Sequence, residues 1–296
     1  MTDAGLQKYF HRVPELQAHP FFRDTGLKED LDAGKVFPAI RKNEVNFYYA
    51  GARLCAFRGK QMYTSSRYLG AEGKSSEVRI EDHWFSAAKY QKIKTNCEKR
   101  RGPTSELRIV SELFREFSIA RSDLPADRAV LLDIECRFPG SEKAQDMIDC
   151  VFLTPEGTLV FVEAKLTTNN AARGIEGSEP AVVCQLKRYR QQLQSQHLRD
   201  QIRDDFVRVS ATLGEILGGR QLPAPKTVFA DVPLLFVGRP SSVYAKDVWQ
   251  RDLLKNPSPN EWRIIVIDGR NNGVGMIPAL HDFFRQLAGK PVEAAP

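Results

Sequence analysis

The fold of this chain is decided by the stretch DMIDCVFLTPEGTLVFVEAKL, residues 146–166. Two apolar runs rich in β-branched residues, 147–153 and 158–166, flank the tetrapeptide TPEG. Proline at the second position and glycine at the fourth are typical of a type I turn. The stretch therefore predicts a β-hairpin.

Three ionisable side chains interrupt these apolar strands. Because side chains alternate along a strand, Glu163 and Lys165 point to one face of the second strand. Two charges in an apolar strand cost stability unless they are paired or hydrated, and Asp149 on the partner strand supplies a third charge. The hairpin is therefore a candidate metal site. The alternative is a buried salt bridge between Lys165 and either carboxylate, which would contribute little net stability because desolvation offsets the attraction.

Length and composition indicate an ordinary globular protein of 296 residues, forming one large domain or one domain with a smaller appendage. Its 43 Lys and Arg against 37 Asp and Glu give a net charge of +6, which favours a polyanionic partner without establishing one. The five cysteines are scattered, with no C-x-x-C pair and no histidine at ligand spacing, so neither zinc nor disulfides are expected. Without a bilayer-length apolar run or a hydrophobic signal core, we expect a cytoplasmic protein with no membrane contact.

A small β-rich module is predicted over residues 1–80. Its runs VNFYY, RLCAF and QMYTS are separated by turn residues, and GAEGKSSE (70–77) follows as a loop or linker. Basic and aromatic residues interleave between positions 41 and 67, which suits a nucleic-acid surface. In the alternative reading, the aromatic residues form the core of the module and the basic residues its solvated face. The residues concerned are Arg41, Lys42, Arg53, Arg58, Lys60 and Arg67, with Phe47, Tyr48, Tyr49, Phe57 and Tyr63.

A second domain is predicted over residues 81–287, followed by a disordered tail at 288–296. We expect helices at 82–97, from 104 or 105 to 119, through 182–217 with one break, and at 279–287, and strands at 129–138, 228–237 and 262–267. Alternation in the first of these strands puts Asp133 on its polar face, and Pro233 suggests that the strand carrying it lies near an edge. The polar segment 167–181 is expected to be a mobile loop.

The helix beginning near residue 104 carries one acid on its inward side. Its apolar stripe consists of Leu107, Val110, Leu113, Phe114 and Phe117. Glu106 falls about 40° from the centre of that stripe on a helical wheel. It is therefore a candidate site residue. The alternative is an acid in the first turn that the helix dipole favours.

The order helix, strand, strand with Asp149, strand with Glu163-x-Lys165, helix, strand resembles the PD-(D/E)XK nuclease superfamily, which has the restriction-endonuclease-like fold. The resemblance extends from about residue 104 to 237, with the N-terminal module outside it. Gln185 and Tyr189, four residues apart on one helical face, resemble the Q-x-x-x-Y element of the RecB-type branch. Considered alone, Tyr189 would more simply pack in the core and Gln185 would be exposed.

The resemblance implies an α/β fold with a central mixed sheet flanked by helices, and Mg²⁺- or Mn²⁺-dependent hydrolysis of DNA phosphodiester bonds. Phosphodiester cleavage requires charge neutralisation at the phosphate and activation of water, which a divalent cation supplies. Mg²⁺ takes oxygen ligands. Asp149 and Glu163 are the expected ligands, with the backbone carbonyl of Ala164 and with Glu106. Lys165 would orient the attacking water and stabilise the charged transition state.

Residues on the following helix are expected to contact the substrate. Gln185 and Tyr189 would reach a phosphate or a base near the scissile bond, while Lys187, Arg188 and Arg190 would add salt-sensitive phosphate affinity. The RecB-like element favours a role in repair, recombination or anti-phage defence. The sequence contains no helicase or ATPase motif, so a motor or recognition partner would be another chain. The sequence does not decide whether the chain forms a homodimer.

Two rival readings remain at this point. One is a catalytically silent nuclease fold that serves as a DNA-binding or protein-interaction module. The other is an unrelated fold in which the Glu163-x-Lys165 match is chance, which would be favoured if these residues lay far from Asp149. The sequence does not decide between single- and double-stranded substrates, DNA and RNA, or endo- and exonucleolytic cutting.

Overall fold

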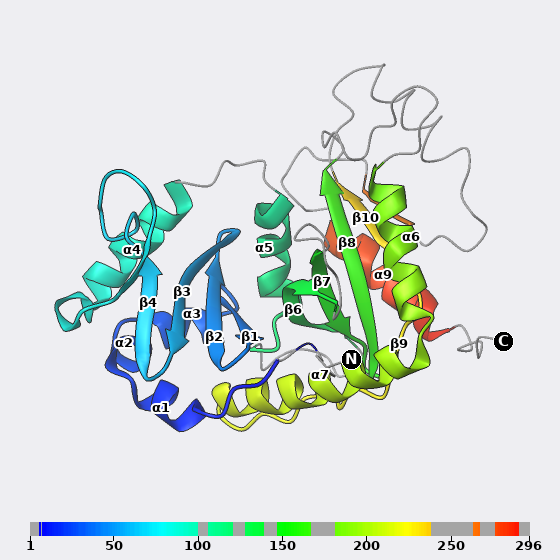
Figure 1. Ribbon diagram of the computed structural model, residues 1–296, viewed down its shortest axis with the longest axis horizontal. Helices are drawn as coiled ribbons and strands as arrows, with labels where there is room; N and C mark the ends of the chain where they lie inside the picture. The colour runs from blue at the N-terminus through cyan, green and yellow to red at the C-terminus, as the bar shows by residue number, and fades with distance from the viewer. Residues whose placement is uncertain are drawn as a thin grey trace, which may run out of the picture.

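Two β-sheets stand side by side in the computed structural model, which describes residues 6, 8–99, 106–120, 128–138, 147–166, 181–237, 263–266 and 276–289. Figure 1 shows the long helix α7 (Gln196–Ile216) running below both sheets and α5 (Glu106–Phe117) standing between them. One apolar core continues from the first sheet into the second, on the side of the second sheet that faces α7. The chain is therefore a mixed α/β protein whose two sheets share packing.

The first sheet is antiparallel throughout, in the order β1-β2-β3-β4-β5. The predicted turns between its strands are confirmed, and Ala50 and Lys60 adopt positive φ angles of 48° and 76° beside Gly51 and Gly59. The segment predicted as a linker is part of this sheet at its end, where β5 begins at Glu77. The strands are β1 (Phe37–Arg41), β2 (Glu44–Tyr49), β3 (Ala52–Arg58), β4 (Gln61–Ser65) and β5 (Glu77–Arg79).

Four helices and a short 3-10 turn cover the first sheet: α1 (Val13–Ala18), α2 (Pro20–Asp24), α3 (Leu27–Asp32), the 3-10 turn η1 (Asp82–Trp84) and α4 (Ala87–Lys99). The helix predicted from residue 82 thus begins as η1. α4 packs on β2 and β3, so this helix lies against the first sheet. Phe47, Tyr48 and Phe57 are buried, as expected if the aromatic residues form the module's core.

The second sheet is mixed, in the order β11-β10-β8-β7-β6, and β9 also pairs with β8. β7 is antiparallel to both of its neighbours, β6 and β8, whereas β10 runs parallel to both β8 and β11. Helices α5 and α9 cover the face that carries Val160 and Val162, while α6 and α7 cover the face that carries Phe161. The elements are β6 (Val130–Arg137), β7 (Met147–Leu153), β8 (Thr158–Leu166), α6 (Ala181–Leu193), β9 (Thr227–Val228), β10 (Leu234–Val237), β11 (Arg263–Val266) and α9 (Met276–Ala288).

The predicted hairpin is confirmed residue by residue at β7 and β8. Gly157 has a φ angle of 93°, and its N–H donates to the Thr154 carbonyl at 2.9 Å. A Cβ atom at this position would lie 2.7 Å from the Ala224 carbonyl oxygen, so only glycine fits. The predicted break in the long helical stretch is also confirmed, between α6 and α7. The predicted loop at 167–180 and the tail from 290 lie outside the described residues.

The expectation that Pro233 lies inside a strand is wrong, because it falls between β9 and β10. The strand after it, β10, lies between β8 and β11 inside the sheet. Pro233 precedes β10, and its carbonyl accepts the N–H of Glu163 at 3.0 Å. The missing N–H of proline therefore removes no bond of the β10 ladder. None of the helices in the described ranges is both long and apolar enough to cross a bilayer.

The expectation that Asp133 faces solvent is also wrong, because its exposed fraction is 0%. The β6–β7 register shifts between Leu131 and Asp133, which breaks the simple alternation of faces. The Asp133 carboxylate binds Lys8 from the N-terminal segment, and it accepts from Arg41 of β1 at 2.6 Å. Arg41 also donates to the carbonyl of Ile134 at 2.6 Å. This buried charge cluster joins the two sheets.

Replacing Asp133 by Asn should lower the free energy of unfolding by about 3–5 kcal/mol, because buried Lys8 and partly buried Arg41 would lose their counter-charge. Urea unfolding measures the change. Asp32→Asn, which removes an exposed pair with Lys28, is the matched control and should have little effect. Equal losses in the two variants would contradict the role assigned to Asp133.

The contribution of Asp133 should also disappear in acid. Burial alone would raise the pKa of Asp133, but the charges and hydrogen bonds of Arg41 and Lys8 outweigh burial and hold it below the ordinary value of 3.8. A lowered folded-state pKa means that the stabilisation is complete above about 3.8 and is lost as the pH falls through the folded value. The difference in unfolding free energy between wild type and Asp133→Asn should therefore shrink below about pH 4. A difference that is constant down to pH 2 would contradict this assignment.

Candidate functional site

Asp149, Glu163 and Lys165 meet where the hydrogen-bond ladder between β7 and β8 ends. The last residues paired at this end are Cys150 and Val162. Beyond them, Asp149 Oδ2 accepts the backbone N–H of Ala164 at 2.8 Å. A side-chain carboxylate thus takes the place of a ladder bond and lies directly beside β8.

Three oxygen atoms surround the ammonium group of Lys165. Its Nζ atom lies 2.5 Å from Glu163 Oε1, 3.1 Å from the carbonyl oxygen of Ala164 and 3.7 Å from Asp149 Oδ2. These are three of the four residues predicted to supply metal ligands. Asp149 thus lies close to Glu163 and Lys165, whereas a large distance would have favoured a chance match.

The cluster is buried at one end and open at the other. Exposed side-chain fractions are 1% for Glu163, 9% for Lys165 and 15% for Asp149. Charges at such depth interact more strongly than they would in water. The partial exposure of Asp149 leaves the cluster within reach of ions and small solutes.

The donor atoms of this cluster are hard oxygen atoms. Neighbouring Cys150 supplies no thiolate, because burial raises the pKa of its thiol well above the ordinary value and the charges of Asp149 and Glu163 raise it further. Oxygen donors without sulfur are typical of Mg²⁺ and Mn²⁺ sites.

The number of side-chain ligands is small. Across the described ranges, no group of three or more His, Cys, Asp or Glu residues is arranged to hold a metal ion. Two carboxylates and one carbonyl fit Mg²⁺, which usually keeps several water molecules. Glu106 begins α5, but its side chain lies outside the described residues, so its contribution stays a prediction.

Gln185 and Tyr189 contact each other on α6, where Gln185 Nε2 donates to the Tyr189 hydroxyl oxygen at 2.7 Å. The Tyr189 ring is fully buried and meets Phe138 edge-on, with ring centroids 5.7 Å apart. Phe138 also packs on Phe161, and side-chain alternation puts Phe161 on the same face of β8 as Glu163. The pair therefore lies on the helix that covers the face carrying the candidate site.

The three cations predicted to bind phosphate have different surroundings. Lys187 is exposed and Arg188 is half-buried. Arg190 forms an ion pair with Asp231, whose carboxylate also accepts the N–H of Val232 at 2.7 Å. Arg190 thereby supports the backbone that leads into β10, beside Glu163. A single acid ahead of a strand gives no sequence signal for such a role, so Asp231 could not have been predicted.

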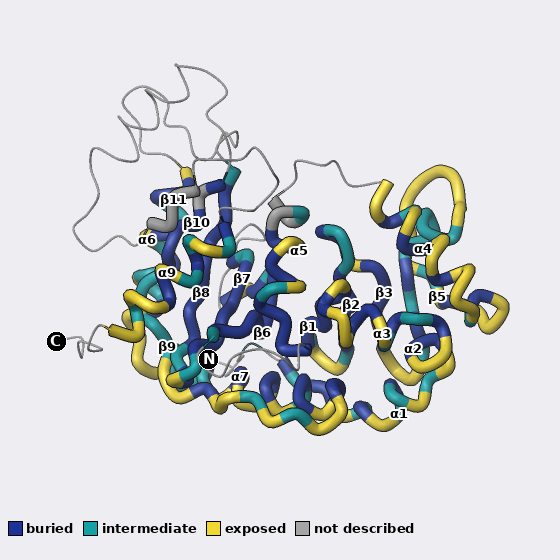
Figure 2. The backbone as a smooth tube through the Cα atoms, turned by 180° about the vertical axis from the view of Figure 1, so that it is seen from behind, coloured by how far each residue is buried: buried dark blue, intermediate teal, exposed yellow. Residues whose placement is uncertain are grey.

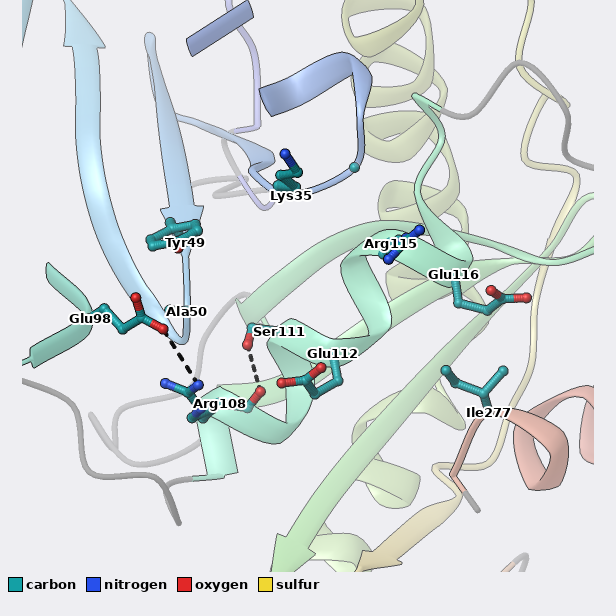
Figure 3. A pocket seen from close by; sticks show the side chains of 11 residues that line it. Lys35, Tyr49, Ala50, Glu98, Arg108, Ser111, Glu112, Arg115, Glu116 and Ile277 are labelled. Carbon is teal, nitrogen blue, oxygen red and sulfur yellow. Dashed lines mark hydrogen bonds and ion pairs between the residues drawn. The ribbon is translucent and has the colours of Figure 1, made fainter. Parts of the chain in front are cut away.

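A cavity of about 390 Å³ lies away from this cluster, between the first sheet and α5 (Figure 3). Arg108 forms an ion pair with Glu98 across it, at 3.6 Å. Its lining includes three basic residues, Lys35, Arg108 and Arg115, and three acidic residues, Glu98, Glu112 and Glu116. Because these charges balance, the cavity has no preference for an anion, and none of the predicted site residues lines it.

None of the family models, curated proteins or solved structures compared with this chain matches it. The basis for inferring its function is therefore the chemistry of Asp149, Glu163 and Lys165.

Replacing Lys165 by Met should lower the free energy of unfolding by about 3–5 kcal/mol in metal-free buffer, because Glu163 would keep a buried charge after losing the ammonium. Mg²⁺ should then raise the thermal midpoint of this variant more than that of wild type, because in the variant the ion does not compete with an ammonium group for the same oxygen atoms. Lys226→Met, at an exposed lysine, is the control. An identical Mg²⁺ response in all three proteins would contradict cation binding by this cluster.

Proposed function

We propose that this chain is a Mg²⁺- or Mn²⁺-dependent nuclease that hydrolyses DNA phosphodiester bonds. The observation that carries the proposal is the convergence of oxygen atoms from Asp149, Glu163 and Ala164 on one cationic position. The order α5, β6, β7, β8, α6, β10 supports it, because it is the order on which the resemblance to PD-(D/E)XK nucleases rests.

The charges of the cluster support a divalent cation. Asp149 and Glu163 together carry two negative charges and Lys165 carries one positive charge. Counted over these three side chains alone, the net charge is −1, and a bound cation would lower the cost of burying the two carboxylates. Asp149, Glu163 and the Ala164 carbonyl would hold the metal ion, with Glu106 as a further candidate. When bound, the ion supplies charge neutralisation at the scissile phosphate and activates water near neutral pH.

Lys165 would act on the reacting groups. Its ammonium group is held by the Glu163 carboxylate and the Ala164 carbonyl, so it is positioned beside the ligand oxygens. From there it can donate to the attacking water and stabilise the charge that develops on the phosphate. The Tyr189 hydroxyl fixes the amide group of Gln185, which orients Gln185 for contact with a phosphate or a base.

The second candidate is a catalytically silent nuclease fold that binds DNA or a protein. The observation that favours it is that the ammonium of Lys165 already pairs with one carboxylate oxygen of Glu163, Oε1, at 2.5 Å. Ion pairing alone, however, gives no reason for a second carboxylate 3.7 Å away at Asp149. A role in repair, recombination or anti-phage defence rests on the Gln185–Tyr189 element alone, and any motor or recognition partner would be another chain.

Purified protein should cut DNA only when Mg²⁺ or Mn²⁺ is present. Asp149→Ala and Lys165→Ala should each slow cutting at least about a hundredfold, because each removes a group that stabilises the transition state. Linear, circular and single-stranded DNA, with RNA in parallel, identify the substrate and separate endonucleolytic from exonucleolytic cutting.

Glu156→Ala, in the exposed turn of the same hairpin, is the matched control and should cut at the wild-type rate. Metal-dependent cutting that persists in Asp149→Ala or Lys165→Ala would overturn the site assignment. DNA binding with no cutting under any condition would favour the silent module.

A further inference from the structure

Three lysines form a stripe on the outer face of α4. Lys89, Lys92 and Lys99 are separated by three and seven residues, which puts them on one side of the helix, and all three are exposed. Within the part of the chain that the structure describes, none of them has an ion-pair partner. The Nζ atoms of Lys89 and Lys92 lie 5.0 and 5.8 Å from the ring centroid of Trp84, so the ring supports both ammonium groups beneath the stripe.

The other charged side chains near the end of α4 point elsewhere. Lys94 is buried and forms an ion pair with Asp30 at 2.5 Å. Glu98 faces the cavity and pairs with Arg108 of α5 at 3.6 Å. No acidic side chain of α4 therefore lies within its lysine stripe. Repulsion between neighbouring lysines destabilises a helix, and a bound polyanion would neutralise that repulsion.

A neighbouring loop adds to this charge. Asn96, on the same side of α4 as the lysines, donates from Nδ2 to the carbonyl of Tyr68 at 2.8 Å. The loop at 66–76 therefore lies beside the stripe, and it carries Arg67 and Lys74 against one acid, Glu72. We call this set the α4 basic surface: Lys89, Lys92, Lys99, Arg67 and Lys74. Residues 8–99 contain 17 Lys and Arg against 11 Asp and Glu, an excess of 6 that equals the net charge of the whole chain.

We propose that the α4 basic surface binds the phosphate backbone of duplex DNA. This inference rests on the proposed nuclease function, in which that DNA is the substrate of the site at Asp149, Glu163 and Lys165. Figure 1 shows that α4 and β8 both end on the upper side of the described elements, and we expect one duplex along that side to contact both. Figure 2 colours many residues of α4 as exposed, in contrast to the buried strands.

Phosphate contact with a duplex suits this surface better than single-strand binding. Single strands are usually held by exposed aromatic rings that stack on the bases. Trp84 is only 8% exposed and lies beneath two ammonium groups, so it offers no stacking platform. The basic residues of the first sheet are a weaker alternative, because Arg41 is held by buried Asp133 and Arg53 and Arg58 by Glu77.

The triple variant Lys89→Gln, Lys92→Gln, Lys99→Gln tests this surface. Its affinity for a fluorescent duplex, measured by anisotropy in EDTA, should be about ten- to a hundredfold lower at ~0.1 M salt. The slope of log affinity against log salt should become shallower by about 2 to 3, because three phosphate contacts are lost. The corresponding triple variant to Arg keeps the charges and should bind like wild type. Equal thermal midpoints show that all variants fold.

The triple variant Arg23→Gln, Lys226→Gln, Arg285→Gln removes the same charge from exposed positions outside α4 and should keep the wild-type salt slope. Wild-type affinity in the α4 variant, an equal loss in the control, or tighter wild-type binding of single strands than of duplex would each overturn the inference. These binding results do not depend on cutting. Duplex that is bound through α4 but never cut with Mg²⁺ would overturn the nuclease proposal and leave the α4 surface in place.

Discussion

The burial of Glu163 is the constraint on which the candidate site depends. Its side chain is 1% exposed in the middle of a mixed sheet, where an isolated carboxylate would be very unfavourable. Lys165, two residues further along the same strand, forms an ion pair with this carboxylate. The backbone N–H of Glu163 donates to the carbonyl of Pro233, directly before β10. Asp149 then adds a second carboxylate where the ladder between β7 and β8 ends. The hairpin, the ion pair and the entry of β10 are thus parts of one arrangement.

A second buried carboxylate, Asp133, shows what a purely structural cluster looks like in this protein. Two cations and the backbone N–H of Ile134 bind it, and its side chain is 1% exposed. There the positive charges outnumber the negative one, and the cluster joins the two sheets. At Glu163 the negative charges are in excess and Asp149 is partly open to solvent. That difference in charge and access favours a metal site at one cluster and a structural role at the other.

Local pattern predicted the parts of the fold that local interactions determine. The strands and turn of the 147–166 hairpin follow from residue type and spacing, and the same spacing brought Gln185 and Tyr189 into contact. The burial of Asp133 could not be predicted, because helices cover both faces of this sheet and its cations come from distant segments. The position of Pro233 was wrongly predicted for a similar reason, because it depends on the parallel pairing of β10 with β8, which the sequence alone does not predict. Long-range pairing, rather than local preference, accounts for both errors.

Calorimetric titration of Mn²⁺ into metal-free protein tests the central claim most directly, because it asks whether the oxygen cluster binds a divalent cation without requiring a substrate. Wild type should bind about one ion per chain, and Glu163→Gln, which keeps the side-chain size and removes the charge, should bind at least about tenfold more weakly. The exposed-turn variant Glu156→Gln should match wild type. Equal binding by wild type and Glu163→Gln, or no binding by wild type at millimolar Mn²⁺, would contradict a metal site built on Asp149 and Glu163.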